Sequence, residues 1–190
     1  MKKNICTDKL SDIDYLKHMI PHHQVAVDIS IMLQKTSKSA KMQEILRKLI
    51  WTQEYEINMM NEMLYTLPHS ITDDINNKKY IKLSTDFIKP NKLGLTNTYC
   101  DPHFFDPEEH IKHMSHIKLN EKVYLEHMIP HHQVAVDMSK TLIKNTENDF
   151  MIFLAYRIIK SQQDEIILLN NYLQTLKKNK GYDYKSELLN

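Results

Sequence analysis

The sequence is poor in the residues on which turn-rich folds depend. It contains two glycines and six prolines in 190 residues, and 42% of the residues are hydrophobic. Sandwiches and barrels need many tight turns, for which glycine is the most permissive residue. The composition therefore favours a compact, all-α protein. The two cysteines, Cys6 and Cys100, are too few for a disulfide framework, so an oxidising compartment is not indicated.

An excess of charge of one sign and a long apolar run are also missing. Twenty-five basic residues stand against twenty-four acidic ones, which does not fit the basic surface of a nucleic-acid-binding protein. No apolar segment approaches the ~20 residues of a membrane span. Residues 1–10 lack the apolar stretch of a secretory signal. We therefore expect a soluble, intracellular protein that has neither a nucleic-acid partner nor a membrane span.

Two catalytic motifs of helical metalloproteins are absent as well. The sequence has no Glu-x-x-His, the motif that two helices of a di-iron carboxylate bundle contribute. It also has no His-Glu-x-x-His, the motif of many zinc hydrolases. The sequence thus favours a protein that is not an enzyme, and we assign no catalytic residue.

The sequence instead contains one eleven-residue stretch twice. Residues 18–28 read HMIPHHQVAVD, and residues 127–137 are identical to them. Six of the eleven histidines lie in these two copies. The two copies belong to longer regions, residues 15–64 and 124–173, that align without a gap. Such an internal duplication predicts two copies of one structural unit.

The first repeat, residues 11–67, has apolar residues at the 3.6-residue spacing of an amphipathic helix. The pattern predicts one helix from Ser11 or Asp12 to about Lys35. After a polar turn, it predicts a second helix that ends near Leu67. The two helices form an antiparallel hairpin whose apolar faces need a partner.

The second repeat, residues 120–177, follows the same pattern, so the two hairpins are expected to pack as a four-helix bundle in a single domain, residues 1–190. The connection between them, residues 68–119, is as long as the crossover of a ferritin-like bundle, and residues 107–118 predict a short histidine-rich helix. We expect the polar tail after residue 177 to fray.

The repeated stretch carries side chains that bind transition metals. Imidazole suits Cu(II), Zn(II) and Ni(II), and thioether sulfur prefers Cu(I). Residues three or four positions apart lie on one side of a helix. In each repeat a glutamate also falls within an apolar stripe, where a lone carboxylate is unfavourable unless it is paired or ligated. The candidate metal ligands are His18, Met19, His22, His23, Glu56, Met59, Met60, Met63, His127, Met128, His131, His132 and Glu165.

The two repeats differ in their soft ligands. The second repeat has no methionine at the positions of Met59, Met60 and Met63. We therefore expect the first repeat to hold a soft-metal site and the second to hold a harder, weaker or purely structural counterpart. Gln53 and Gln162, one turn from the two glutamates, are expected to hydrogen-bond the ligands.

A second histidine cluster lies in the connection between the repeats. Its members are His110, His113, Met114 and His116. Three histidines at this spacing share one face of a helix and bind a metal loosely. The alternative is an ordinary solvated face, and the spacing alone does not decide between the two.

The repeated motif resembles a known family. The Met-Ile-Pro-His-His-Gln cluster is followed some thirty residues later by Gln-x-x-Glu-Ile, as in the ferritin-like family catalogued as domain of unknown function 305. The resemblance covers residues 13–64 and 122–173. It implies a four-helix bundle and copper binding through histidine and methionine, and it implies no established enzymatic activity.

Two functions follow as hypotheses. The first is a protein that buffers, stores or hands over copper, or alternatively zinc or another transition metal, with a metal-donor or metal-acceptor protein as its partner. The second is a non-catalytic structural or interaction bundle, in which hydrogen bonds between histidine and Glu or Gln specify packing. A form between the two has one histidine of each adjacent pair bind the metal while its neighbour bonds to the glutamate.

Overall fold

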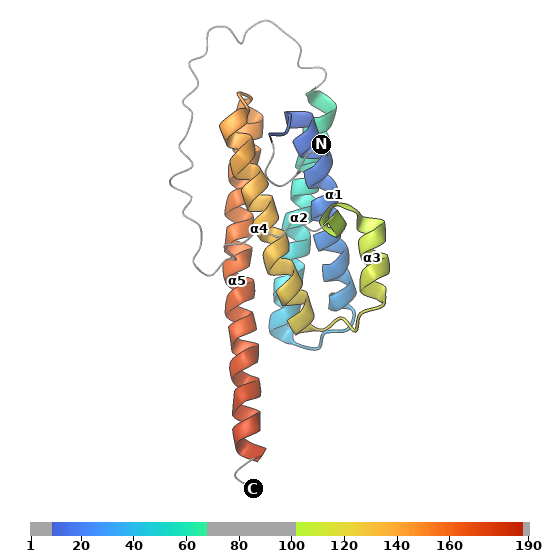
Figure 1. The fold of residues 1–190 in the computed structure, drawn as a ribbon, viewed down its shortest axis with the longest axis vertical. Coiled ribbons are helices and arrows are strands. Elements are labelled where there is room, and N and C mark those ends of the chain that lie inside the picture. The colour runs from blue at the N-terminus through green and yellow to red at the C-terminus, as the bar shows by residue number, and fades with distance from the viewer. Residues whose placement is uncertain (1–8, 68–101, 188–190) are drawn as a thin grey trace, which may run out of the picture.

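A computed structural model of the chain describes residues 9–67 and 102–187, which contain helices and no strand (Figure 1). Cys6, Cys100 and most of the connection between the repeats lie outside these residues. In the described part of the chain, no helix has both the length and the apolar character of a membrane span. The elements are α1 Asp12–Gln34, α2 Ala40–Thr66, the 3-10 helix η3 Pro102–Phe105, α3 Pro107–Ser115, α4 Glu121–Asn145 and α5 Asp149–Glu187.

The helices begin where the sequence supplies a capping side chain. Ser11 Oγ accepts a hydrogen bond from the Asp14 amide of α1 at 3.1 Å. Asn120 Oδ1 accepts the corresponding bond from the Val123 amide of α4, also at 3.1 Å. Each cap satisfies an amide that has no partner inside its helix. The predicted start of the first helix is confirmed.

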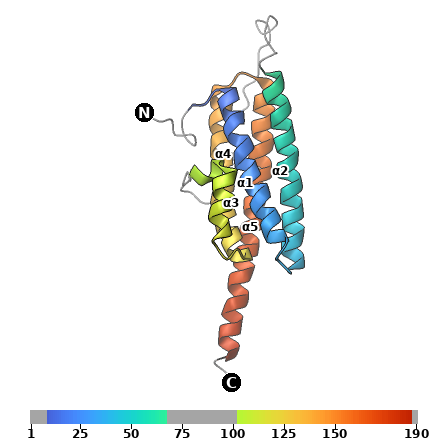
Figure 2. The same cartoon turned by 90° about the vertical axis from the view of Figure 1, so that its right-hand side faces the viewer.

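The four long helices form two hairpins that pack side by side. Helices α1 and α2 form the first hairpin, α4 and α5 form the second, and α1 lies against α4 in the middle of the bundle (Figures 1 and 2). The core consists of the apolar stripes of all four helices, because neither hairpin buries its own stripe alone. The prediction of an all-α bundle of two duplicated hairpins is confirmed.

Two parts of the helix prediction differ from the structure. In the connection, α3 ends at Ser115, short of the predicted range 107–118, and no pattern in the sequence predicted the 3-10 helix η3 before it. We expected the tail after residue 177 to fray. In the structure, α5 continues as a helix to Glu187 and extends beyond the rest of the bundle (Figure 1). No proline interrupts this segment, and its lysines are good helix formers.

Two buried hydrogen bonds join the hairpins in a symmetric way. The hydroxyl of Tyr15 in α1 lies 2.7 Å from Ser139 Oγ in α4, and that of Tyr124 in α4 lies 2.7 Å from Ser30 Oγ in α1. Tyr15 and Tyr124 are equivalent positions of the two repeats, and so are Ser30 and Ser139. Helices α1 and α4 are therefore antiparallel and related by a pseudo-twofold axis. The axis passes midway between the two bonds, near His22 of α1 and His131 of α4.

These bonds give a prediction for stability. Tyr15→Phe removes a hydroxyl from a fully buried ring and leaves Ser139 without this partner. We expect the free energy of unfolding to fall by about 1–2 kcal/mol. The exposed Tyr55 provides the matched control, since Tyr55→Phe keeps the ring and should change the free energy of unfolding by less than about 0.5 kcal/mol. Urea denaturation measures both, and equal effects would show that the buried bond contributes nothing.

Candidate metal centre

The pseudo-twofold axis brings one histidine of each repeat into contact. His22 and His131 are fully buried, and their rings stack with 3.7 Å between centroids. Burial lowers the pKa of each imidazole well below its usual range, and the neighbouring histidines lower it further. Both rings are therefore neutral near pH 7, and neutral imidazole is the form that binds metal ions.

The stacked rings leave ring nitrogens without hydrogen bonds. His22 Nε2 lies 3.1 Å from the backbone oxygen of His131. The other nitrogen of His22 and both ring nitrogens of His131 are buried and have no hydrogen-bond partner. A buried polar atom without a partner costs about 1–3 kcal/mol. Such atoms call for an explanation, and a ligand that they bind is one.

Further imidazoles extend from this stack toward the connection between the repeats. The ring of His127, one turn before His131 in α4, lies 6.0 Å from that of His131 between centroids. The ring of His110, from α3, lies 4.9 Å from His127. Phe104, from η3, directs its ring against both His127 and His131, at 5.2 and 4.8 Å. Three helices and η3 thus enclose one group of histidine rings.

The spacing of these rings limits how a metal would bind. An ion about 2.0–2.1 Å from one nitrogen of each of two imidazoles places their centroids about 5–6 Å apart. The pairs His110–His127 and His127–His131 have this spacing, whereas His22 and His131 are too close for it. Among the described residues, no group of three or more His, Cys, Asp or Glu side chains is arranged to hold an ion. The arrangement is suited to two imidazole ligands.

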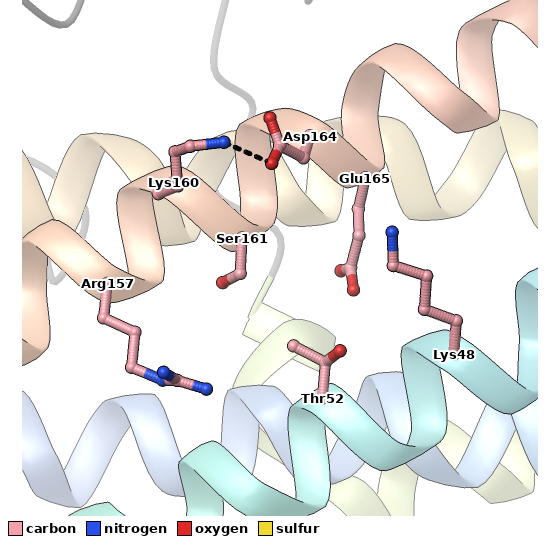
Figure 3. Close-up of a pocket in the computed structure, with 7 residues that line it drawn as sticks. All are labelled: Lys48, Thr52, Arg157, Lys160, Ser161, Asp164 and Glu165. Carbon is pink, nitrogen blue, oxygen red and sulfur yellow. Dashed lines mark hydrogen bonds and ion pairs between the residues drawn. The ribbon is translucent and has the colours of Figure 1, made fainter.

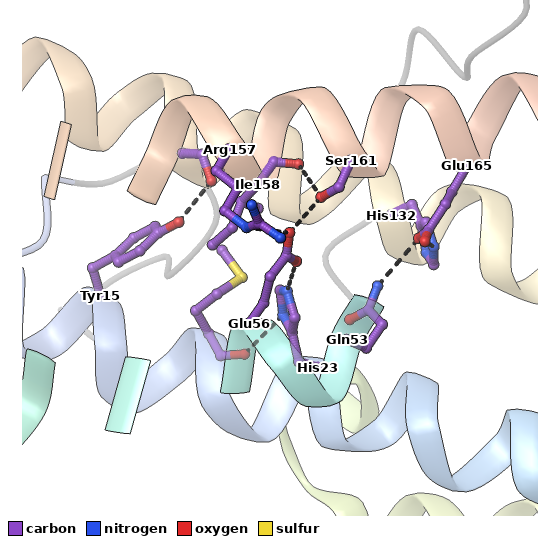
Figure 4. A network of polar contacts seen from close by, with 11 residues as sticks. Tyr15, His23, Gln53, Glu56, His132, Arg157, Ile158, Ser161 and Glu165 are labelled. Atoms are coloured by element: carbon purple, nitrogen blue, oxygen red, sulfur yellow. Dashed lines mark hydrogen bonds and ion pairs between the residues drawn. The ribbon is translucent and has the colours of Figure 1, made fainter. Parts of the chain in front are cut away.

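His23, which follows His22 in the first repeat, is fully engaged in hydrogen bonds. His23 Nε2 lies 2.9 Å from Glu56 Oε2, and His23 Nδ1 lies 3.1 Å from the Met19 carbonyl oxygen (Figure 4). Each ring nitrogen of His23 lies within hydrogen-bond distance of an oxygen, so neither is left for a metal. Ser161 Oγ donates to the other carboxylate oxygen of Glu56 at 2.7 Å. Glu56 is therefore satisfied although it is fully buried.

The equivalent pair in the second repeat is less well satisfied. His132 Nε2 lies 2.7 Å from Glu165 Oε2, which also accepts a hydrogen bond from Gln53 Nε2 at 3.3 Å (Figure 4). His132 Nδ1, Glu165 Oε1 and the side-chain amide of Gln162 have no hydrogen-bond partner. Gln162 is the equivalent of Gln53, which donates to Glu165, so the equivalent partner of Gln162 would be the carboxylate of Glu56. That carboxylate already accepts a hydrogen bond from Ser161. Among the described residues, most of the buried side-chain nitrogen and oxygen atoms without a hydrogen-bond partner thus lie in the second repeat.

The other candidate ligands lie in varied surroundings. His18 is half-buried, and its Nδ1 lies 2.6 Å from the Asp14 backbone oxygen. The methionines pack in or against the apolar core, and their role as ligands stays a prediction. Those that are buried are Met19, Met60 and Met128, and those that are partly buried are Met59 and Met63.

The histidine cluster of the connection does not share one face. In α3, His110 and Met114 are buried and His113 is exposed, and His116, which follows the end of α3, is exposed as well. The expectation that the three histidines lie on a common face is wrong. One side of α3 packs on α1, and His110 lies on that side, whereas His113 and His116 face the solvent. Sequence reasoning also missed Phe104 and Phe105. The sequence signal that could have identified them is their position as two adjacent aromatic residues beside the histidine-rich segment.

A groove opens between α2 and α5, beside Glu165 (Figure 3). It has a volume of about 260 Å³. Arg157, from α5, places its guanidinium over the Tyr55 ring at 4.6 Å and its Nε 3.8 Å from Glu56. The lining residues are Lys48, Thr52, Arg157, Lys160, Ser161, Asp164 and Glu165. They include no histidine, so the groove is distinct from the group of imidazole rings.

Solved structures with the same fold include metal-bound proteins. CopM in the Cu(II)-bound form is 25% identical, with a TM-score of 0.61 over 89% of this chain and 99% of that one. CopM in the Ag-bound form is 23% identical, with a TM-score of 0.62 over 88% and 98%. A DUF305 fragment from Deinococcus radiodurans is 18% identical, with a TM-score of 0.60 over 86% and 95%. These likenesses show that the fold is shared.

Comparisons of sequence point to the same group of proteins. Uncharacterized protein L153 of Acanthamoeba polyphaga mimivirus is 42% identical over 59 residues, which are 31% of this chain and 39% of that protein. The chain thus matches well under half the length of this relative. The sequence model of the domain of unknown function DUF305 matches residues 6–81 and 105–185, more than half of the chain. The chain belongs to the DUF305 family.

Proposed function

We propose that the chain binds copper, which it buffers, stores or hands over, and that His127 and His131 are the centre of the site. The observation that carries the proposal is the state of His131. Its ring is fully buried, and neither of its nitrogens has a hydrogen-bond partner. A bound ion would use a nitrogen that otherwise destabilises the fold, since burial without a partner is unfavourable.

The geometry favours Cu(I) over zinc. Structural zinc sites use four ligands in a tetrahedron, whereas the described residues offer no group of three such side chains. Cu(I) accepts two ligands in a nearly linear arrangement, for which two imidazole centroids lie about 6 Å apart. The 6.0 Å between His127 and His131 fits this arrangement. The similar structures of CopM in Cu(I)-bound, Cu(II)-bound and Ag-bound forms support the choice of metal.

Handover of the ion requires that one ligand is exchanged for another. His110 lies 4.9 Å from His127 between ring centroids, and it comes from α3, a nine-residue helix outside the four-helix bundle. A third imidazole on a separate, short helix provides the replacement ligand that such an exchange needs. A metal-donor or metal-acceptor protein would then approach at α3.

The test is a competition titration with Cu(I) on the wild type and on His131→Phe. Phenylalanine keeps an aromatic ring at the stack but has no nitrogen. We expect the variant to lose the tightest Cu(I) site, and His116→Gln, at an exposed histidine, to bind as the wild type does. Loading should also raise the melting temperature of the wild type with ligand excess. Equal Cu(I) affinity in His131→Phe and the wild type would refute the site.

A structural function is the second candidate, and a specific observation favours it. Both glutamates receive a hydrogen bond from the histidine of their own repeat, at 2.9 and 2.7 Å. Such pairs specify how two helices pack without any metal. If His131→Phe raises stability and leaves Cu(I) binding unchanged, the histidines serve packing.

A further inference from the structure

The groove between α2 and α5 is lined by equivalent residues of the two repeats. Lys48 in α2 is the equivalent of Arg157 in α5, at the repeat offset of 109, and Thr52 and Ser161 are equivalent in the same way. The two halves of the groove nevertheless differ in how their buried carboxylates are bonded. We propose that the groove binds a free α-amino acid, whose ammonium group contacts Glu165 and whose carboxylate contacts Lys48.

The half of the groove around Glu56 is closed by the protein itself. One carboxylate oxygen, Glu56 Oε1, accepts a hydrogen bond from Ser161 Oγ at 2.7 Å and lies 3.8 Å from Arg157 Nε. The other, Glu56 Oε2, lies 2.9 Å from His23 Nε2. Both oxygens therefore have a protein partner, and this half needs no ligand.

The half around Glu165 is open. Glu165 is only 4% exposed, and its Oε1 has no hydrogen-bond partner. Thr52, at the position equivalent to Ser161, does not bond to this oxygen. The Glu165 side chain extends from α5 toward Lys48 and Thr52 of α2 (Figure 3). A buried carboxylate oxygen without a donor is unfavourable, so a ligand that donates to it, as an ammonium group does, is stabilising there.

The charges of the groove favour a ligand that carries both signs. Lys160 is paired with Asp164 at 2.5 Å, and Arg157 lies beside Glu56. Lys48 and Glu165 then offer one positive and one negative group from opposite walls (Figure 3). A simple cation would be repelled by Lys48, and a simple anion by Glu165. An α-amino acid carries an ammonium and a carboxylate on one carbon atom and so complements both.

The size of the groove is suited to a single small amino acid. Its volume of about 260 Å³ lies just below the range of about 300–1,000 Å³ for ordinary ligand pockets. The aliphatic stems of Lys48 and Lys160 and the methyl group of Thr52 provide apolar contacts for a short side chain. A residue inside a peptide chain has neither a free ammonium nor a free carboxylate, so a peptide is a poorer ligand than the free amino acid.

The test is a nuclear magnetic resonance titration of the metal-free, ¹⁵N-labelled full chain with L-alanine. We expect saturable shifts of the backbone amides of Thr52 and Glu165. N-acetyl-L-alanine lacks the ammonium group and L-alanine amide lacks the carboxylate. Each should bind at least about tenfold more weakly, because a hydrogen bond to a charged group is lost.

Two variants assign the contacts. Lys48→Met and Glu165→Gln should each weaken L-alanine binding by about tenfold or more. Arg47→Met is the matched control for Lys48→Met, since Arg47 is the exposed preceding residue of α2 and does not line the groove. It should leave the affinity within twofold of the wild type.

Three results would overturn the proposal. The absence of saturable shifts would mean that the groove holds only water. Equal binding of L-alanine and N-acetyl-L-alanine would show that Glu165 recognises no ammonium group. Equal losses in Lys48→Met and Arg47→Met would identify a general effect of surface charge. The titration uses metal-free protein, so its outcome is independent of copper binding at His127 and His131.

Discussion

Replacing Glu56 by leucine is expected to reduce the free energy of unfolding by about 1–3 kcal/mol, the cost of leaving a buried hydrogen-bonding group without its partner. Glu56 is fully buried and accepts hydrogen bonds from His23 at 2.9 Å and from Ser161 at 2.7 Å. Leucine keeps much of the side-chain volume but accepts no hydrogen bond. His23 Nε2 is then left buried without its partner.

The matched control for this substitution is Glu54→Leu. Glu54 lies on the same helix, two residues earlier, and is exposed. Its replacement should change the free energy of unfolding by less than about 0.5 kcal/mol. Chemical denaturation followed by circular dichroism compares the two variants. Similar losses in both would mean that the buried carboxylate has no special role in stability.

A double substitution separates the hydrogen bond from the space that the side chains fill. In Glu56→Leu with His23→Leu, neither polar partner remains. Replacing both members of a buried pair by apolar side chains is often close to neutral. We therefore expect the double variant to be more stable than Glu56→Leu alone. A double variant that is less stable would show that His23 contributes through contacts other than the carboxylate.

The sequence was sufficient for the parts of the fold that depend on local pattern. Ser11 and the 3.6-residue spacing after it predicted the first helix, which begins at Asp12. The repeat at an offset of 109 predicted two equivalent hairpins, because each has one apolar face that it cannot bury alone. Glu56 and Glu165 stood out as carboxylates within apolar stripes, and each bonds to a histidine of its own repeat.

The contacts between the repeats could not be predicted in the same way. The stacking of His22 on His131 depends on where the pseudo-twofold axis crosses α1 and α4, and residue spacing within one repeat does not determine this position. The bonds Tyr15–Ser139 and Tyr124–Ser30 fix the axis, but a serine within a helix gives no sign of a distant partner. The inward position of His110 likewise depends on how α3 packs on α1.

Acid is expected to destabilise the metal-free protein through His22 and His131. Burial holds the pKa of both below its usual value of 6.5 in the folded state, whereas the unfolded chain has the ordinary pKa. Below about pH 6.5 the unfolded state therefore binds more protons than the folded state, and stability falls as the pH falls. Above about pH 6.5 both states are neutral at these residues, and they add no pH dependence.

Each such histidine contributes at most about 1.4 kcal/mol per pH unit, so the pair contributes at most about 2.7 kcal/mol per unit until the folded-state pKa values are reached. His131→Phe removes one of the two groups, and the remaining titratable residues are common to both proteins. Between pH 6.5 and 5.5 we expect the variant to lose about 1 kcal/mol less stability than the wild type. Urea denaturation across this range measures the difference, and parallel pH profiles would mean that His131 takes up its proton equally easily in the folded and unfolded chain. Because a bound ion occupies the neutral ring, copper loading should steepen the wild-type loss as protons displace the metal.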